Sequence, residues 1–174
     1  MNTKTYVGKS RFGKGVFAKE RIRAGEDILF FDGEIITFRQ AIEKSEFEGN
    51  PLQIGHDLYV DIKEPSVFLN HSCNPNAGIV KNRVLIAIKD IFPSDEICFD
   101  YSTTMMENRW TMACKCGFRD CRGIIKDFCC LPEYIKRHYL QSGIVQDFIA
   151  AGYQDMPIDN SRVGRAVPAA YKNK

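Results

Sequence analysis

The stretch of the chain that decides the fold reads Phe68-Leu69-Asn70-His71-Ser72-Cys73-Asn74-Pro75-Asn76. An apolar start is followed at once by a run of side chains that donate or accept hydrogen bonds. Asn74-Pro75-Asn76 predicts a turn, because proline fixes φ and asparagine tolerates turn conformations. A lone histidine is more often structural than a ligand, but His71 stands among other polar groups. The density of polar groups indicates a functional site.

A second motif, Glu96-Ile97-Cys98-Phe99-Asp100-Tyr101-Ser102, reads as a short strand that ends in a tyrosine. Taken alone, Tyr101 is expected to be a core tyrosine whose hydroxyl is hydrogen-bonded. Cys98 is expected to pack in the core as a small apolar side chain. The motif gains functional meaning only together with the others.

A third motif, Cys114-Lys115-Cys116-Gly117-Phe118-Arg119-Asp120-Cys121-Arg122-Gly123, crowds three cysteines together. The chain has seven cysteines, and their clustering argues for a metal site in a reducing compartment over a disulfide framework. Three thiolates are one ligand short of a closed tetrahedral zinc site. The spacing leaves the fourth ligand open between a histidine and the remaining cysteines, Cys73, Cys98, Cys129 and Cys130.

A fourth motif, Arg11-Phe12-Gly13-Lys14-Gly15-Val16-Phe17-Ala18, carries two glycines one residue apart. Such glycines let the backbone turn tightly and approach a ligand closely. The segment does not follow a strand and open a helix, so it is not a dinucleotide-binding fingerprint. On its own it predicts a glycine turn between two strands.

The composition sets the limits of the fold and of its partners. A length of 174 residues with 44% hydrophobic and 26% charged residues is typical of one globular domain. No stretch approaches the roughly 18 apolar residues of a membrane span, and Met1–Tyr6 has no secretory signal pattern. The net charge is +2, and the first 130 residues sum to zero, which argues against nucleic acid as a direct ligand.

One segment departs from this even balance of charge. Residues 40–64 contain six acidic and only two basic side chains. The simpler interpretation is a solvated acidic face. The alternative is a surface that meets a basic partner.

The hydrophobic pattern predicts mostly strands in the first hundred residues. The predicted strands are Ile28–Phe31, Glu34–Thr37, Leu58–Ile62, Ala77–Lys81, Val84–Ile88 and Glu96–Phe99. Asp32-Gly33 and Asn82-Arg83 predict hairpin turns between the strands that flank them. Helices are expected over 39–48, from Pro132 to Gly143 and over 144–151, and the tail beyond Asp155 is expected to be disordered.

Together and in this order, the four motifs resemble the SET-domain family of protein lysine methyltransferases. The resemblance covers roughly residues 5–128. It implies a mainly β fold of small curved sheets and short helices, with a knot-like threading of the chain after Asn76. The implied domains are a SET domain (5–103), a post-SET zinc-binding segment (104–128), a helical C-terminal extension (129–152) and a disordered tail (153–174), without a pre-SET segment.

The resemblance implies S-adenosylmethionine as the cofactor. Lys14 and Gly15 would lie along the methionine end of the cofactor with their backbone. Asn70 and His71 match the pair that holds its adenine and amino ends. Phe128 is the candidate for an aromatic wall over the cofactor.

The resemblance also assigns the reaction and the metal. Tyr101 matches the catalytic tyrosine, and Phe99 and Phe31 match residues of the channel for the substrate lysine. Cys73 matches the cysteine that completes the zinc site together with the three cysteines of the third motif, Cys114, Cys116 and Cys121. Zinc would thereby tie the post-SET segment to the active site.

The implied function is methyl transfer to lysine in a basic protein or peptide such as a histone tail, within chromatin in the nucleus or in the cytoplasm. Phe99 stands where a tyrosine disfavours bulkier amines, which implies two or three added methyl groups. The chain departs from the family pattern at Phe31, where a tyrosine is usual, and at Val67, where an arginine is frequent.

Two other functions compete with the enzyme. The first is a catalytically inactive SET-like module that binds protein, against which the intact Asn70, His71 and Tyr101 argue. The second is a zinc-knuckle nucleic-acid binder, against which the neutral charge argues. The C-terminal helices are expected to pack on the core, with a homodimer contact as the alternative.

Overall fold

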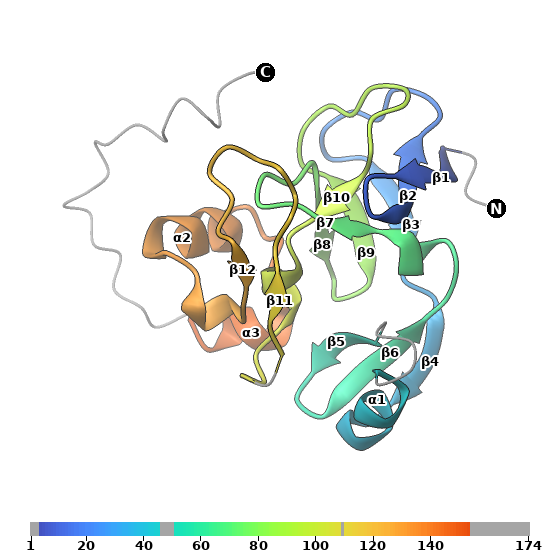
Figure 1. Cartoon of the computed structure of the whole chain (residues 1–174). Coiled ribbons are helices and arrows are strands. Elements are labelled where there is room, and N and C mark those ends of the chain that lie inside the picture. Colours follow the sequence, from blue (N-terminus) through green and yellow to red (C-terminus); the bar gives the residue numbers. More distant parts are fainter. Residues whose placement is uncertain (1–3, 46–50, 109, 154–174) are drawn as a thin grey trace.

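The computed structural model describes residues 4–45, 51–108 and 110–153. In this part of the chain, short strands form several small sheets with short helices between them (Figure 1). The mainly β architecture with short helices that the sequence predicts is confirmed. The predicted helix beyond Ser45 and the predicted disordered tail from residue 154 lie outside the described residues.

The glycine motif forms the second strand of a hairpin. Strands β1 (Thr5–Ser10) and β2 (Gly13–Ala18) pair antiparallel around a turn at Arg11 and Phe12. Gly13 has a φ of 104°, in the region that favours glycine. The predicted turn between two strands is therefore present, but Arg11 and Phe12 form it and both glycines lie in β2.

The second sheet has three antiparallel strands in the order β3 (Asp27–Phe30), β9 (Val84–Ala87) and β8 (Ala77–Val80). Its β8–β9 hairpin turns at Asn82, as the sequence predicts. The hairpin predicted at Asp32-Gly33 is wrong, because β3 pairs with β9.

The third sheet explains what Gly33 does instead of forming a hairpin. Strand β4 (Gly33–Ile36) pairs with β6 (Leu58–Ile62), and β6 pairs with β5 (Pro51–Gly55). A Cβ atom at Gly33 would collide with the backbone oxygen of Asp61. The glycine thus permits a close approach where the chain crosses from one sheet to the next. Helix α1 (Phe38–Ser45) packs beside this sheet (Figure 1).

Two very short sheets organise the remaining motifs. Strand β7 (Asn70–His71) follows the 3-10 helix η1 (Ser66–Phe68) and pairs parallel with β10 (Cys98–Phe99). Strand β11 (Met112–Ala113) pairs antiparallel with β12 (Ile124–Ile125) on either side of the cysteine motif. The knot-like threading remains a prediction.

The C-terminal segment packs on the rest of the chain through its own apolar cluster. It contains η3 (Phe128–Cys130), α2 (Glu133–Gln141) and α3 (Asp147–Ala151). Their buried side chains meet apolar residues near β8 and β9, among them Val80 and Ile86. This is the simple packing that the sequence predicts, and nothing in the described residues supports the homodimer contact.

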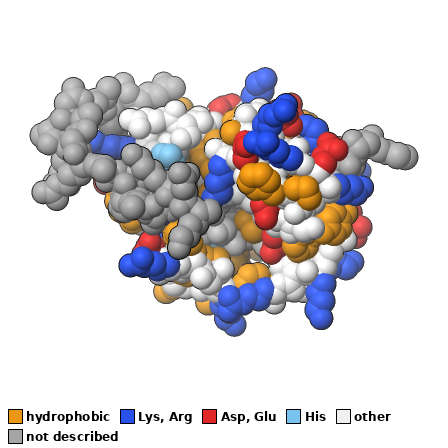
Figure 2. Space-filling view, turned by 90° about the horizontal axis from the view of Figure 1, so that it is seen from above, with side chains coloured by type: hydrophobic (Ala, Val, Ile, Leu, Met, Phe, Trp, Pro, Cys, Tyr) orange, Lys and Arg blue, Asp and Glu red, His pale blue; other side chains and the backbone are white. Residues whose placement is uncertain are grey.

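The main core takes side chains from the first three sheets and from both central motifs, among them Leu69 and Phe99. On the face shown in Figure 2, acidic and basic side chains lie among apolar ones. This agrees with the near-zero net charge of the chain. None of the described helices is both long and apolar enough to span a membrane.

Candidate functional site

Parallel pairing of β7 with β10 brings the first two motifs together. Asn70 lies opposite Cys98, and His71 lies opposite Phe99. The side chain of Asn76 fixes this arrangement from the turn: its Oδ1 accepts from Cys98 N at 2.8 Å, and its Nδ2 donates to the Glu96 carbonyl at 2.8 Å. Two segments distant in sequence therefore form one junction.

Tyr101 begins the 3-10 helix η2 (Tyr101–Thr104) at the end of this junction. Its hydroxyl donates to the carbonyl of Leu69 at 2.6 Å, and its amide donates to Nδ1 of His71 at 3.2 Å. Burial raises the pKa of the phenol, and the charges of Cys98 and Glu96 act in the same direction. Tyr101 is therefore held as a neutral hydroxyl between the two motifs.

A buried carboxylate next to Tyr101 connects the junction with the cysteine motif and with the C-terminal helices. Asp100 is 2% exposed and accepts two hydrogen bonds from Arg122 at 2.7 Å each. The hydroxyl of Tyr139 in α2 donates to the same carboxylate at 3.0 Å. Burial alone would lower the pKa of Arg122, but the hydrogen bonds and charge of Asp100 raise it. We call Asp100, Arg122 and Tyr139 the Asp100 network.

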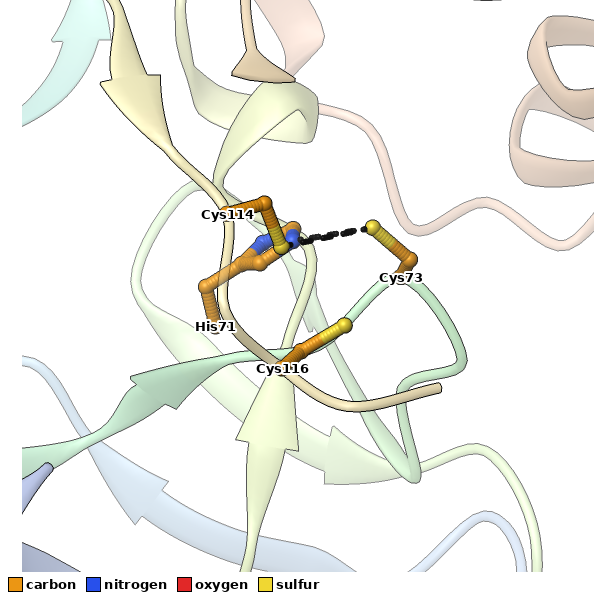
Figure 3. A group of neighbouring side chains, drawn as sticks. All are labelled: His71, Cys73, Cys114 and Cys116. Carbon is orange, nitrogen blue, oxygen red and sulfur yellow. Dashed lines mark hydrogen bonds between the residues drawn. The ribbon is translucent and has the colours of Figure 1, made fainter. Parts of the chain in front are cut away.

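Side chains that could together hold a metal ion lie next to this network, because the Arg122 amide donates to the Cys73 sulfur at 3.5 Å. Figure 3 shows the four residues of this group. One ligand atom from each residue of a group of four lies within 4.8 Å of the others. The four residues are His71, Cys73, Cys114 and Cys116. The Nε2 atom of His71 is 3.3 Å from the Cys73 sulfur, and the Cys73 and Cys114 sulfurs are 3.7 Å apart. Thiol and imidazole donors of this kind suit zinc.

Three of the four predicted zinc ligands are thus members of one cluster. Cys121 is not a member, but its sulfur lies 3.8 Å from the backbone oxygen of Cys114 and accepts from the Gly123 amide at 3.4 Å. Its role as the fourth ligand stays a prediction. Among the other cysteines, Cys129 and Cys130 are exposed and adjacent to one another, with sulfurs 3.8 Å apart.

The predicted cofactor contacts fall into two places. The Nδ2 atom of Asn70 donates to the Lys14 carbonyl at 3.0 Å and to Oε1 of Glu96 at 2.7 Å. A Cβ atom at Gly15 would stand 2.5 Å from the same Glu96 oxygen and 2.9 Å from the Cβ atom of Ser10, so a larger residue would require these side chains to shift. Phe128 instead lies fully buried in the C-terminal cluster. Its assignment as an aromatic wall over the cofactor stays a prediction.

A cavity of about 470 Å³ opens next to the junction. Phe99 and Tyr101 line it, whereas Phe31 stands behind Phe99, with ring centroids 6.0 Å apart. The opposite side comes from α1, β5 and β6, and from Met105, Glu107, Trp110 and Asp127. This cavity is the candidate for the channel that takes the substrate side chain.

Most of this cavity could not be predicted from the motifs. Tyr59, Glu107, Trp110 and Asp127 line it, yet they stand outside all four motifs. The only available signal was the single tryptophan of the chain, which is 43% exposed at the cavity.

Comparison with known proteins agrees with this geometry. The model of the family described as SET domain matches residues 13–102. The chain belongs to the SET-domain family. This confirms the family and the fold that the motifs imply.

The relatives of this SET-domain chain are larger proteins. It is 34% identical over 116 residues to the probable histone-lysine N-methyltransferase lin-59 of Caenorhabditis elegans. The matched region covers 60% of this chain and 9% of that protein. Among solved structures, the methyltransferase domain of human histone-lysine N-methyltransferase SETMAR has a TM-score of 0.57 at 21% identity, over 71% of this chain and 58% of that one.

A further structural relative was solved with a cofactor. It is ctPRC2 in an autoinhibited conformation bound to S-adenosylmethionine, with a TM-score of 0.52 at 24% identity, over 60% of this chain and 16% of that one. At these identities, the structural likeness shows the fold.

Proposed function

We propose that the chain is an S-adenosylmethionine-dependent protein-lysine N-methyltransferase. The observation that carries the proposal is the position of Tyr101. Its neutral hydroxyl is fixed by the Leu69 carbonyl at the junction of two motifs and lines a cavity large enough for a side chain. Membership of the SET-domain family supports the same reaction.

The cavity suits an amine that must lose its proton before it reacts. Only about 0.04% of an ordinary lysine is neutral at pH 7, which corresponds to about 4.6 kcal/mol. Apolar surroundings disfavour the charged ammonium and lower its pKa. Phe99 and Leu69 provide such surroundings next to Tyr101. The chain therefore favours the neutral amine by excluding water around it.

Tyr101 would orient the amine, because its oxygen is fixed by one strong hydrogen bond to Leu69. Correct alignment of two reacting groups accounts for a large share of rate acceleration in such reactions. The bound cofactor supplies the methyl group from its sulfonium sulfur. Lys14, Gly15 and Asn70 meet beside Glu96, and we assign to them, with His71, the binding of that cofactor.

The cysteine cluster fits a structural zinc ion. We assign Cys73, Cys114, Cys116 and Cys121 as its ligands, since three of these belong to the cluster and the Cys121 sulfur lies 3.8 Å from the backbone oxygen of Cys114. Zinc at this point would hold the third motif against the first. The Asp100 network holds the third motif against the second through charge.

The proposed substrate is a basic protein such as a histone. The C. elegans relative is a probable histone-lysine methyltransferase, and Glu107 and Asp127 give the cavity an acidic side. A histone substrate would place the protein in the nucleus. Phe99 has no hydroxyl to oppose a bulkier amine, and we propose that two or three methyl groups are added.

The test is transfer of labelled methyl groups from S-adenosylmethionine to mixed core histones. Tyr101→Phe is the matched variant, because it removes only the hydroxyl. We expect labelling by the native chain and a loss of at least about 100-fold in the variant. Equal labelling by both proteins would contradict the role of Tyr101. Cofactor binding with no labelling of any protein substrate would favour the inactive binding module.

A further inference from the structure

The cavity beside Tyr101 has a second, charged side. Glu107 and Asp127 both line it. Asp127 is only 3% exposed, and its Oδ2 accepts from the Asn108 amide. Its Oδ1 has no hydrogen-bond partner among the described residues. Within the same residues, no lysine or arginine forms an ion pair with either carboxylate.

Glu107 is held in place and not free to turn towards solvent. The side chain of Gln53, which is 4% exposed, donates to Oε1 of Glu107 at 2.7 Å. The Oε1 atom of Gln53 in turn accepts from the Met106 amide at 3.2 Å. Burying a carboxylate without a counter-ion costs free energy, and a bound cation would offset that cost.

Aromatic rings flank these carboxylates. Trp110 and Tyr59 line the cavity, and the Tyr59 ring packs on Phe38 with centroids 6.0 Å apart. Burial raises the pKa of Tyr59, and the negative charges of Glu107 and Asp127 add to the rise. The negative charges of Glu107 and Asp127 therefore both act on Tyr59, which lines the same cavity. Aromatic faces beside carboxylates are the chemistry that binds a planar cation.

The target lysine does not suit a position next to the carboxylates of Glu107 and Asp127. A neighbouring carboxylate raises the pKa of an amine, whereas methyl transfer needs the neutral form. An arginine side chain suits this position, because its guanidinium stays charged, stacks on aromatic rings and pairs with carboxylates. The cavity, at about 470 Å³, has the size of a pocket for a small molecule, about 300–1,000 Å³, and exceeds one lysine side chain.

We infer that the cavity contains an arginine subsite and that the substrate carries an arginine within two residues of the target lysine. The subsite consists of Tyr59, Glu107, Trp110 and Asp127. It rests on the proposed function, because the lysine at Tyr101 fixes the position of the peptide. The substrate class is thereby narrowed from basic peptides to peptides with neighbouring arginine and lysine.

The first experiment uses synthetic peptides and needs no known substrate. A single lysine in an alanine-rich decapeptide is flanked by arginine at each of the positions from −2 to +2, and each peptide is matched by one with citrulline, the neutral analogue. We expect at least one arginine position to lower KM by about tenfold or more relative to citrulline, with kcat little changed, as for a hydrogen bond to a charged group. Equal KM values at all positions would overturn the inference.

Variants then assign the effect to the subsite. Glu107→Gln keeps the contact with Gln53 but removes the charge, and it should bring the arginine and citrulline peptides to the same KM. Trp110→Ala, at an exposed side chain, gives a second variant with little risk to folding. Glu34→Gln, exposed on β4 outside the cavity, is the matched control and should leave the difference intact. The same loss of discrimination in this control would overturn the assignment.

A binding measurement separates this inference from the proposed function. Fluorescence anisotropy with a labelled arginine–lysine peptide and the Tyr101→Phe protein requires no methyl transfer. Preferential binding of arginine over citrulline there supports the subsite even if histones are not methylated. Binding without that preference overturns the subsite and leaves the methyltransferase proposal standing.

Discussion

The two sides of the cavity are held by different kinds of interaction. On the side of Tyr101, the Asp100 network places a buried carboxylate between an arginine of the cysteine motif and a tyrosine of α2. On the opposite side, α1 and the sheet of β4–β6 rest on a small apolar cluster of Ile36, Ala41 and Tyr59, with ion pairs near the surface such as Arg39–Glu43.

This difference predicts different tolerance to change. A buried charge network fails as a unit, because each partner that is lost leaves the others without compensation. A small apolar cluster loses free energy in proportion to the buried area that a substitution removes, and exposed ion pairs contribute little. We therefore expect the Tyr101 side to fix the geometry of the reaction and the α1 side to adapt to the substrate.

The most severe way to break the Asp100 network is Asp100→Asn. It leaves the Arg122 guanidinium, whose side chain is 13% exposed, without its counter-charge. Loss of one partner of a buried ion pair costs about 3–5 kcal/mol. We expect the free energy of unfolding, measured with urea, to fall by that amount. Asp120→Asn, at an exposed position, is the control. A loss below about 1 kcal/mol would contradict a unitary network.

Tyr139→Phe removes a single hydroxyl from the same network. Tyr139 is 1% exposed, and the loss of a hydrogen bond to a charged group costs about 1.5–3 kcal/mol. We expect that decrease in unfolding free energy, and faster release of zinc to a chromogenic chelator, because Arg122 adjoins Cys121 in the sequence. Tyr134→Phe, 60% exposed on the same helix, should change neither quantity. If the variant released zinc as slowly as the native chain, the hydrogen bond from α2 would not contribute to zinc binding by the cysteine motif.

Phe38→Ala tests the adaptable side. Its ring packs on Tyr59, and an aromatic pair contributes about 0.5–1.5 kcal/mol beyond its buried area. We expect a small loss of stability, a higher KM for peptide and a kcat within about threefold of the native value. Ile35→Ala, exposed on β4 outside the cavity, is the control. A large loss of kcat with unchanged KM would mean that Phe38 helps to fix the geometry of the reaction. It would contradict the expectation that the α1 side adapts to the substrate.

The two sides also differ in how far the sequence predicts them. The Tyr101 side follows from motifs, because the groups that fix Asn70 and Tyr101 belong to the motifs themselves: Leu69, Lys14 and Glu96. Cys73 and Cys114 meet only through the tertiary fold, and the family resemblance supplied that pairing. The α1 side has no motif: Glu107 and Asp127 are twenty residues apart and reach one wall because Gln53 holds the first and Asn108 the second.

The turn at Asp32-Gly33 was misjudged because a tight turn and a close approach to Asp61 both require glycine.

The finest expected effect concerns the product and not the rate. Phe99 is 6% exposed, and its ring centroid is 4.9 Å from that of Tyr101. Phe99→Tyr places a hydroxyl among apolar rings, where it must find a hydrogen-bond partner. The amine itself or a trapped water can serve, and either leaves less room for an amine that already carries a methyl group.

We therefore expect the native chain to form di- and trimethyl-lysine and Phe99→Tyr to stop at the monomethyl stage. Mass spectrometry of the peptide product under excess enzyme measures this ratio. Phe12→Tyr, 43% exposed in the β1–β2 turn, controls for an added hydroxyl elsewhere. Monomethyl product alone from the native chain would contradict the assignment. Because the Asp100 network is untouched by this change, the first methyl transfer should stay within about tenfold of its native rate, which separates control of the product from control of the reaction geometry.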